Sequence, residues 1–188
     1  MESILFVNAC ARPESRTKLL ANHVLSLLPG QVETVDLNTE HIPLLDGSEL
    51  EKRNDLLARG ELDAPMLRYA RQFAQADTIV IAAPYWDLMF PALLKIYLEA
   101  ITVSGITFKY NEGRPYSLCR AKKLIYITTA GGPIGEYDFG FQYVSTMAQG
   151  FFGIHDVHCI RAENLDIIGA DVEAILSQAK KQADALFN

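Results

Sequence analysis

TIVIAA, residues 78–83, is the most apolar segment of the chain, and PYWDLMFP, residues 84–91, follows it directly. A short apolar run with β-branched residues, ended by turn-forming residues, is typical of a strand buried on both faces of a parallel sheet. The run ILFV at residues 4–7, ahead of the polar loop 8–14, has the same character. These two stretches predict the central strands of a parallel sheet.

Strand-like and helix-like patterns alternate along the rest of the chain. Apolar residues recur at helical spacing from Leu19 until Pro29-Gly30 ends the pattern, and Pro91 opens another helix where its missing N–H costs nothing. The predicted strands are Ile4–Val7, Val32–Leu37, Thr78–Ala83, Lys123–Thr129 and Val157–Ala162. The other predicted helices cover residues 65–76, 141–152 and 171–186.

One long segment, residues 38–64, interrupts this alternation. Pro43, Asp46-Gly47 and a charged stretch make it irregular, and we predict an excursion that contains a short helix. The apolar side chains of Ile42, Leu44 and Leu45 are expected to be buried there. A short extension is expected at residues 106–110.

Strands that alternate with helices predict an α/β fold with helices on both faces of a parallel sheet. Right-handed crossovers and five strands favour the order 2-1-3-4-5, the flavodoxin-like, doubly wound arrangement, in one domain spanning residues 1–188. Ligands of such sheets bind at the carboxyl ends of the strands, where the winding direction reverses. The loops after Val7, Ala83 and Thr129 are therefore the candidate site.

Composition limits the function further. The chain has 188 residues with a formal net charge of −6, which argues against a nucleic-acid partner because such partners require a basic surface. Neither a signal peptide nor an apolar stretch long enough to cross a membrane is recognisable. Cys10, Cys119 and Cys159 lack metal-ligand spacing and are typical of reduced thiols. A cytoplasmic protein without a resident metal is expected.

The first loop, residues 8–17, leads into a helix and carries groups that bind an anion. Ser15 and Thr17 supply hydroxyls at the helix start, where free N–H groups and the positive end of the dipole favour negative charge. Arg12 and Arg16 can add charge-assisted hydrogen bonds. A terminal phosphate and plain helix capping explain this loop equally well. No glycine lies between residues 7 and 18, so neither a phosphate-binding P-loop nor a GxGxxG fingerprint is present.

The second loop, residues 82–91, places three aromatic side chains and a methionine at the end of the most buried strand. They offer a wall for a planar ring, although aromatic residues more often close a core. The third loop, residues 128–137, contains Gly131-Gly132, which lets the backbone approach a ligand closely or simply makes a turn. Together the three loops suit the phosphate, the face and the edge of one ligand.

In these residues the chain resembles the FMN-dependent NADH azoreductases and related NAD(P)H:quinone oxidoreductases. The resemblance covers nearly the whole chain and depends on the order and spacing of several segments. They are Ser15-Arg16-Thr17, Ile42-Pro43-Leu44-Leu45-Asp46-Gly47, Ala82-Ala83-Pro84-Tyr85-Trp86, Leu94-Lys95-Ile96-Tyr97-Leu98-Glu99, Gly105-Ile106-Thr107-Phe108-Lys109-Tyr110 and Thr129-Ala130-Gly131-Gly132.

The resemblance implies an FMN-binding enzyme with NADH or NADPH as the electron donor. FMN would be bound non-covalently, with its phosphate near Ser15, Arg16 and Thr17. The isoalloxazine ring would lie along Pro84, Tyr85, Trp86, Asp87 and Leu88, with its pyrimidine edge at Thr129, Ala130, Gly131 and Gly132. A homodimer with active sites at the subunit interface is implied, as is ping-pong transfer of two electrons to a quinone, azo compound or nitroaromatic.

Two departures from the family's pattern affect the predicted site. Many members carry a serine near the end of the first strand, where this chain has Ala9 and Cys10, so one phosphate or ribityl contact is expected either to be lost or to be taken over by Arg12. Members often have asparagine in place of Asp87. An ionised carboxylate cannot donate a hydrogen bond, so our hypothesis is that Asp87 lowers the flavin potential; capping a turn is the alternative.

Hydride transfer needs no catalytic acid, because the cofactor carries the chemistry. Tyr137 and Asp138 are nevertheless candidate proton sources beyond the glycine turn.

Three other functions share the predicted fold. A one-electron flavodoxin-type carrier would expose its ring edge to partner proteins, and a flavin-binding redox sensor would bind FMN without turnover. A response-regulator-like domain needs an acidic cluster at the strand ends, and this chain has none there. The sequence does not identify the physiological electron acceptor, and it does not indicate whether NADH or NADPH is the preferred donor.

Overall fold

The computed structural model describes residues 1–187 and confirms the doubly wound parallel sheet. Its strands are β1 (Ser3–Asn8), β2 (Gln31–Asp36), β3 (Thr78–Ala82), β6 (Lys123–Thr129) and β7 (Asp156–Ala162). They run parallel in the order β2-β1-β3-β6-β7, which is the predicted 2-1-3-4-5 with the strands of this sheet numbered consecutively. The register aligns Val7 of β1 with Val35 of β2 and Ile81 of β3.

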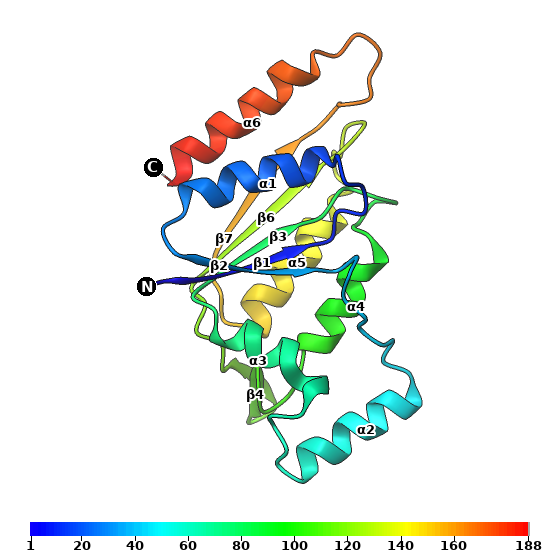
Figure 1. Cartoon of the computed structure of the whole chain (residues 1–188), viewed down its shortest axis with the longest axis vertical. Helices are drawn as coiled ribbons and strands as arrows, with labels where there is room; N and C mark the ends of the chain where they lie inside the picture. Colours follow the sequence, from blue (N-terminus) through cyan, green and yellow to red (C-terminus); the bar gives the residue numbers. More distant parts are fainter. Residues whose placement is uncertain (188) are drawn as a thin grey trace.

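Two helical layers cover the sheet (Figure 1). α1 (Arg16–Leu27) and α6 (Val172–Phe187) lie over one face, and α3 (Arg68–Gln75), α4 (Ala92–Ile101) and α5 (Phe139–Gly150) lie over the other. A 3-10 turn, Pro65–Leu67, precedes α3. Alternate residues of the buried strands therefore enter different cores: Phe6 and Val80 pack on the α1 and α6 side, while Leu5 and Ile79 pack on the other side.

The excursion contains α2 (Gly47–Ala58), which is capped by the Asp46 side chain and projects from the body in Figure 1. Ile42 packs against the core and Leu45 is half-buried, but the expectation that Leu44 is buried was wrong, because its side chain is 66% exposed. The segment turns there, with Asp46 N–H donating to the Leu44 carbonyl, and this turn directs Leu44 away from the core.

Residues 106–117 contain a feature that the sequence reasoning missed. β4 (Phe108–Asn111) and β5 (Arg114–Ser117) form an antiparallel hairpin. Its two-residue turn uses Glu112 and Gly113 with φ of 49° and 76°, the left-handed pair that tight hairpin turns require. The expected short extension at 106–110 is thus the first strand of a small separate sheet.

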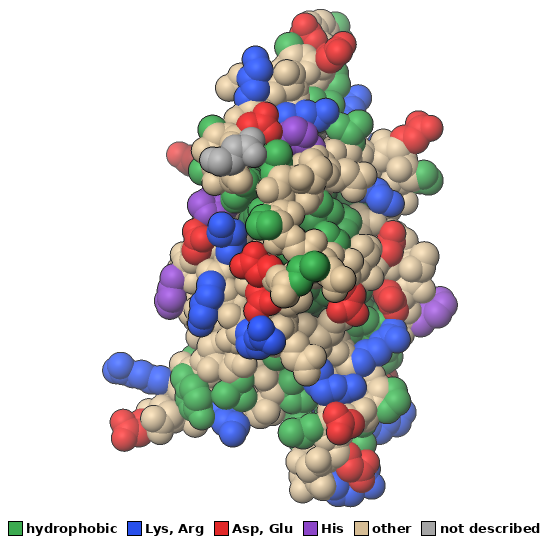
Figure 2. Space-filling model, turned by 60° about the vertical axis from the view of Figure 1, so that its left-hand side comes forward, with side chains coloured by type: hydrophobic (Ala, Val, Ile, Leu, Met, Phe, Trp, Pro, Cys, Tyr) green, Lys and Arg blue, Asp and Glu red, His purple; other side chains and the backbone are tan. Residues whose placement is uncertain are grey.

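Charged side chains of both signs are interspersed over the face shown in Figure 2. Among the described residues, no helix has both the length and the apolar character needed to cross a membrane.

Candidate functional site

A pocket of about 440 Å³ opens at the carboxyl edge of the sheet, where the winding direction reverses. Its volume lies within the range of small-molecule sites. Three of the four loops that form it are the predicted ones, and the fourth follows β7. The lining residues are Ala11, Arg12, Glu14, Ser15, Arg16, Thr17, Pro84, Tyr85, Trp86, Thr129, Ala130, Gly131, Leu165 and Asp166.

The first loop ends in a helix N-terminus that faces the pocket. Ser15 is the N-cap of α1, and its hydroxyl accepts from Lys18 N–H at 3.3 Å. The N–H groups of Arg16 and Thr17, in the first turn, have no partner within the helix, as is general for this position. Arg12 is exposed and forms no ion pair with any described residue. This end of the pocket has the donors and the charge to bind an anion.

Arg16 lines the pocket in the predicted loop, but its guanidinium already has partners within the protein. Its guanidinium donates to Asp166 Oδ1 at 2.7 Å and to the Leu165 carbonyl at 3.2 Å. The side chain thus lines the pocket but is already tied to the β7–α6 loop, so Arg12 carries the unpaired positive charge. Glu14 and Asp166 also line this end, which makes it less basic than the two arginines alone predict.

The side chain of Thr17 lies deeper. It is buried, and its hydroxyl lies 2.6 Å from the hydroxyl of Thr129, which also lines the pocket. This hydrogen bond joins the first loop to the end of β6. Ala9 does not line the pocket: it is fully buried and packs in the core beneath, with its N–H donating to the Ala82 carbonyl at 2.8 Å.

The second loop forms a tight turn. Trp86 and Met89 exchange backbone hydrogen bonds of 3.1 and 2.8 Å, and the two residues between them, Asp87 and Leu88, have φ of 50° and 68°. Left-handed backbone is costly for a branched residue such as leucine and concentrates at functional sites. Tyr85 and Trp86 line the pocket, whereas Asp87 and Leu88 point outside its lining.

The two glycines of the third loop have different surroundings. A Cβ on Gly131 would lie 2.4 Å from Asp166 Oδ2, so this glycine makes room for that carboxylate. A Cβ on Gly132 would meet nothing within 4 Å. The loop is held by the segment after β7, through hydrogen bonds from Leu165 to the Ala130 carbonyl and from Asp166 to the Gly131 carbonyl. Gly132 itself is not among the lining residues.

The fourth loop, with Leu165 and Asp166, was missed in the sequence. The sequence did contain an indication of this loop. The predicted strand β7 is parallel to the others, so the loop that follows it lies at the same carboxyl edge of the sheet, where ligands of this fold bind. Of the two candidate proton sources, Tyr137 is 57% exposed. Asp138 is buried, caps α5 at Phe141 N–H and pairs with Arg161 at 3.0 Å, which makes its role structural in this structure.

Two titratable groups near the pocket have raised pKa values. Burial raises the pKa of the Tyr85 hydroxyl, and the nearby carboxylates of Asp138 and Glu163 add to the effect. Burial also raises the pKa of the Cys10 thiol, against an opposing hydrogen bond from Ser15. Both groups are therefore neutral near pH 7. No group of three His, Cys, Asp or Glu residues suited to a metal ion exists among the described residues.

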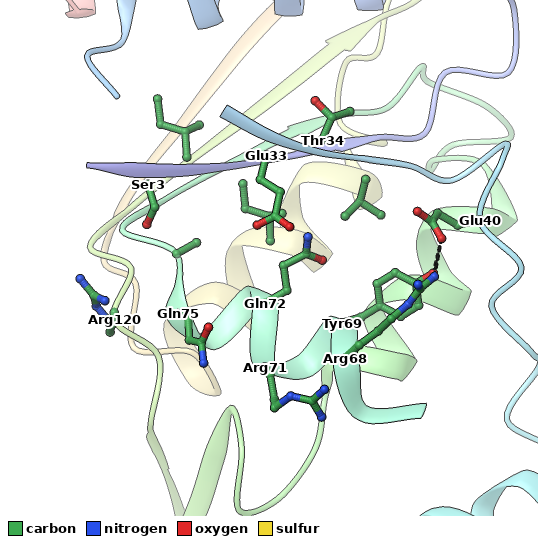
Figure 3. A pocket seen from close by; sticks show the side chains of 14 residues that line it. Ser3, Glu33, Thr34, Glu40, Arg68, Tyr69, Arg71, Gln72, Gln75 and Arg120 are labelled. Atoms are coloured by element: carbon green, nitrogen blue, oxygen red, sulfur yellow. Dashed lines mark hydrogen bonds and ion pairs between the residues drawn. The ribbon is translucent and has the colours of Figure 1, made fainter. Parts of the chain in front are cut away.

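The cavities of about 600, 620 and 660 Å³ elsewhere in the described residues are lined by no residue of the loops after β1, β3 and β6. Figure 3 shows a cavity of about 600 Å³ between β2 and α3. Three of its charged groups have partners, since Arg68 contacts Glu40 and Tyr69, and Arg120 pairs with Asp77 at 2.7 Å. Although α3 begins at this cavity, the cavity lies beside Ser3, Ile4 and Leu5 in the first half of β1, away from the carboxyl ends of the strands where ligands of this fold bind. The pocket at the strand ends therefore remains the candidate site.

The residues present fit a nucleotide-like flavin such as FMN. The helix start with Ser15 and Arg12 offers donors to a phosphate, and the aromatic side chains of Tyr85 and Trp86 offer surface to a planar ring. The open space beside Gly132 leaves room for a ring edge.

Comparison with known proteins identifies related chains and structures. The model of a family described by its flavodoxin-like fold matches residues 2–187. An FMN-dependent NADH:quinone oxidoreductase of Lachnoclostridium phytofermentans is 40% identical over 192 residues, covering 97% of this chain and 96% of the relative. A second one, from Clostridium acetobutylicum, is 40% identical over 199 residues and covers 97% of this chain and 98% of its own length. An azoreductase structure from Bacillus anthracis superposes with a TM-score of 0.86 at 26% identity, covering 100% of this chain and 99% of that one.

Proposed function

The chain belongs to the family of flavodoxin-like FMN-dependent NADH:quinone oxidoreductases and azoreductases, and we propose that it reduces quinones or azo compounds with NADH through FMN bound at the strand-end pocket. The observation that carries this proposal is the pocket itself. It combines an anion-binding helix start with an aromatic wall, at the switch point where this fold binds ligands.

At the phosphate end, we propose that the N–H groups of Arg16 and Thr17 and the hydroxyl of Ser15 bind the FMN phosphate. Arg12 supplies the charge-assisted hydrogen bond, because its guanidinium has no carboxylate partner among the described residues. Arg16 contributes mainly by holding the β7–α6 loop against the pocket, through Asp166 and the Leu165 carbonyl.

At the ring end, Pro84, Tyr85 and Trp86 form the wall, and the stretch from Thr129 to Gly132 forms the edge. The left-handed turn at Asp87-Leu88 fixes the direction in which Trp86 leaves the strand. Asp87 lies outside the lining, which supports the turn role over direct contact with the ring. The hypothesis that Asp87 lowers the flavin potential stays a prediction. It expects Asp87→Asn to raise the midpoint potential of bound FMN, and no rise would count against it.

When bound, FMN supplies the hydride chemistry, and the protein supplies position and exclusion of water. A ping-pong sequence follows if donor and acceptor use the same space beside the ring in turn. Of the two candidate proton donors we favour Tyr137, because its side chain is exposed while both carboxylate oxygens of Asp138 are engaged. The proposal also includes NADPH as a possible electron donor and nitroaromatic compounds as possible acceptors.

A homodimer is part of the proposal. Four large side chains at the ring end are between 42% and 57% exposed: Trp86 and Leu88 in the second loop, Tyr137 in the third, and Phe139 at the start of α5. Large exposed apolar side chains that gather beside a pocket commonly mark an interface. The mass in solution tests this, and a monomer at assay concentration would contradict it. The cytoplasmic location stays a prediction.

The decisive experiment is an anaerobic titration of the FMN-loaded protein with NADH, followed by a quinone. We expect a perturbed flavin spectrum that bleaches in one two-electron step and returns when quinone is added. Parallel lines in initial-rate plots at several quinone concentrations would support the ping-pong order. A flavin that neither NADH nor NADPH reduces would favour the carrier or the sensor instead, and failure to bind FMN would refute the proposal.

A further inference from the structure

A cluster of charged side chains, Arg161, Asp138 and Glu163, supports the loop of residues 132–138 and lies outside the pocket lining. Arg161, near the end of β7, contacts two carboxylates through the same nitrogen: Asp138 Oδ2 at 3.0 Å and Glu163 Oε1 at 3.7 Å. Asp138 is 8% exposed, and Arg161 and Glu163 are partly buried. Burial alone would lower the pKa of Arg161, but Cys159 and the two carboxylates outweigh it and raise that pKa. Two acidic groups thus share one cation.

Each carboxylate in this cluster also holds one end of the same loop, residues 132–138. Glu163 Oε2 accepts from Ile134 N–H at 2.9 Å, near the start of the loop. Asp138 closes the loop at its other end, where Oδ1 caps α5 at Phe141 N–H. Between these anchors the chain turns through Gly135, whose φ is +56°. The loop therefore has a side-chain support near each end, and both supports come from carboxylates paired with Arg161; a backbone hydrogen bond from Asn164 N–H to the Gly132 carbonyl at 3.3 Å adds to the first one.

The loop is connected directly to the aromatic wall of the pocket. The hydroxyl of Tyr85 donates to the Tyr137 carbonyl at 3.1 Å, which joins the second and third loops. A displacement of residues 132–138 would remove the acceptor of this hydrogen bond. It would also move the Gly132 end, which the proposed function places at the edge of the flavin ring.

Removing the cation would leave two carboxylates close together, and one of them is buried. An uncompensated buried charge is costly because the protein interior solvates it poorly. The structure offers Asp138 no second cation, since the described ion pairs give it only Arg161. Asp138 would then have to move towards water, and the loop and the start of α5 would move with it.

We propose that Arg161 is a positioning residue for the flavin site: by neutralising Asp138 and Glu163 it holds residues 132–138 against Tyr85. This inference rests on the proposed function for the identity of the ligand. The loop's dependence on Arg161 can be measured without that ligand.

The test compares Arg161→Gln with a matched control, Arg120→Gln. Arg120 also forms an arginine–carboxylate pair, with Asp77 at 2.7 Å, but near the amino ends of the strands, away from the pocket. In the flavin-free proteins we expect amide hydrogen exchange in residues 132–138 to rise by about tenfold or more in Arg161→Gln and to stay unchanged in Arg120→Gln. Unchanged exchange in Arg161→Gln would overturn the proposal.

Two further variants separate charge from packing. Asn is as good an N-cap as Asp, so Arg161→Gln/Asp138→Asn keeps the α5 cap and removes the buried charge. We expect this double variant to recover most of the protection, and Arg161→Lys to recover part of it. If Arg161→Gln does not fold, the test compares the amide exchange of these two variants with that of the wild type. Exchange that stays fast in both would mean that only the packing of Arg161 matters, and would overturn the proposal.

With FMN added, Arg161→Gln should raise the dissociation constant of FMN about tenfold and lower the midpoint potential of bound FMN, because added negative charge opposes reduction. The double variant should reverse both effects. If the wild-type protein binds no FMN, the proposed function fails while the exchange result still stands. Normal FMN affinity and potential in an Arg161→Gln protein whose loop exchanges fast would overturn the link to the flavin site.

Discussion

The hydrogen bond between Thr17 and Thr129 joins two of the pocket's loops, and its energetic coupling can be measured. Both side chains are buried, at 1% and 9% exposure, and their hydroxyl oxygens are 2.6 Å apart. Valine has nearly the shape of threonine without the hydroxyl. Each single variant, Thr17→Val or Thr129→Val, therefore loses the bond and leaves a buried hydroxyl unpaired, which costs about 1–3 kcal/mol in the free energy of unfolding.

The double variant removes both hydroxyls and leaves neither unpaired, so its cost should fall short of the summed single costs. We expect a coupling energy of about 0.5–1.5 kcal/mol, the net value of a hydrogen bond. Urea unfolding of the four proteins at pH 7 gives this quantity. Thr146→Val is the matched control, because the Thr146 hydroxyl is exposed and bonds only to the Gln142 carbonyl of its own helix. Thr17→Val and Thr146→Val should be additive.

A coupling energy near zero for Thr17 and Thr129 would refute the reasoning. It would mean that the two hydroxyls find other partners when one is removed, so that the first loop and the end of β6 are independent. The pocket would then be assembled by its backbone alone.

Three further predictions concern other parts of the molecule. Asp166→Asn should strengthen FMN binding a few-fold in calorimetry, because it removes a negative charge from the phosphate end while Arg16 still holds the loop through the Leu165 carbonyl. Stability should change by at most about 1 kcal/mol since the pair is exposed, and weaker binding would contradict the prediction. Gly140→Ala should cost about 1–3 kcal/mol of unfolding free energy in urea, because its Cβ would lie 3.1 Å from the Tyr126 hydroxyl and force a shift; an unchanged midpoint would argue against this crowding. Burial alone would raise the pKa of Asp36, but hydrogen bonds from two asparagine residues outweigh it and lower that pKa. The stabilisation by ionised Asp36 is therefore complete above the ordinary carboxyl pKa, and it is lost as the pH falls through the pKa of Asp36 in the folded protein. The difference in unfolding free energy between the wild type and Asp36→Asn should shrink below about pH 4. A difference that is constant down to pH 2 would contradict this prediction.

The fold could be predicted because its signals are local. Runs such as Ile4–Val7 and Thr78–Ala83 carry the strand pattern within a few residues, and the crossover rule then fixes the order of the sheet. The β4–β5 hairpin was missed because a Glu-Gly turn is a weaker signal than Asn-Gly. Leu44 was misplaced because hydrophobicity alone does not tell which way a turn directs a side chain.

The site was predictable as a location more than as a set of contacts. Arg16 carries the right charge in the right loop, but its partner Asp166 is 150 residues away along the chain, and no local pattern announces the pair. Gly131 lines the pocket, and its lack of a side chain also makes room for Asp166 of the same distant loop, which the sequence did not indicate. Both differences come from the β7–α6 loop, which only the assembled sheet brings to the pocket.

The residues that line the pocket are far apart in the sequence, and this determines when the pocket can form during synthesis of the chain. Its lining begins at Ala11 and is complete only with Asp166, and β7 must pair with β6 before the fourth loop can close it. A nascent chain that has emerged as far as β6 therefore has the anion-binding helix start and the aromatic wall, but not the segment that tethers them. We therefore expect FMN to bind the complete pocket, and added flavin to stabilise weakened variants, only after nearly all of the chain has been made.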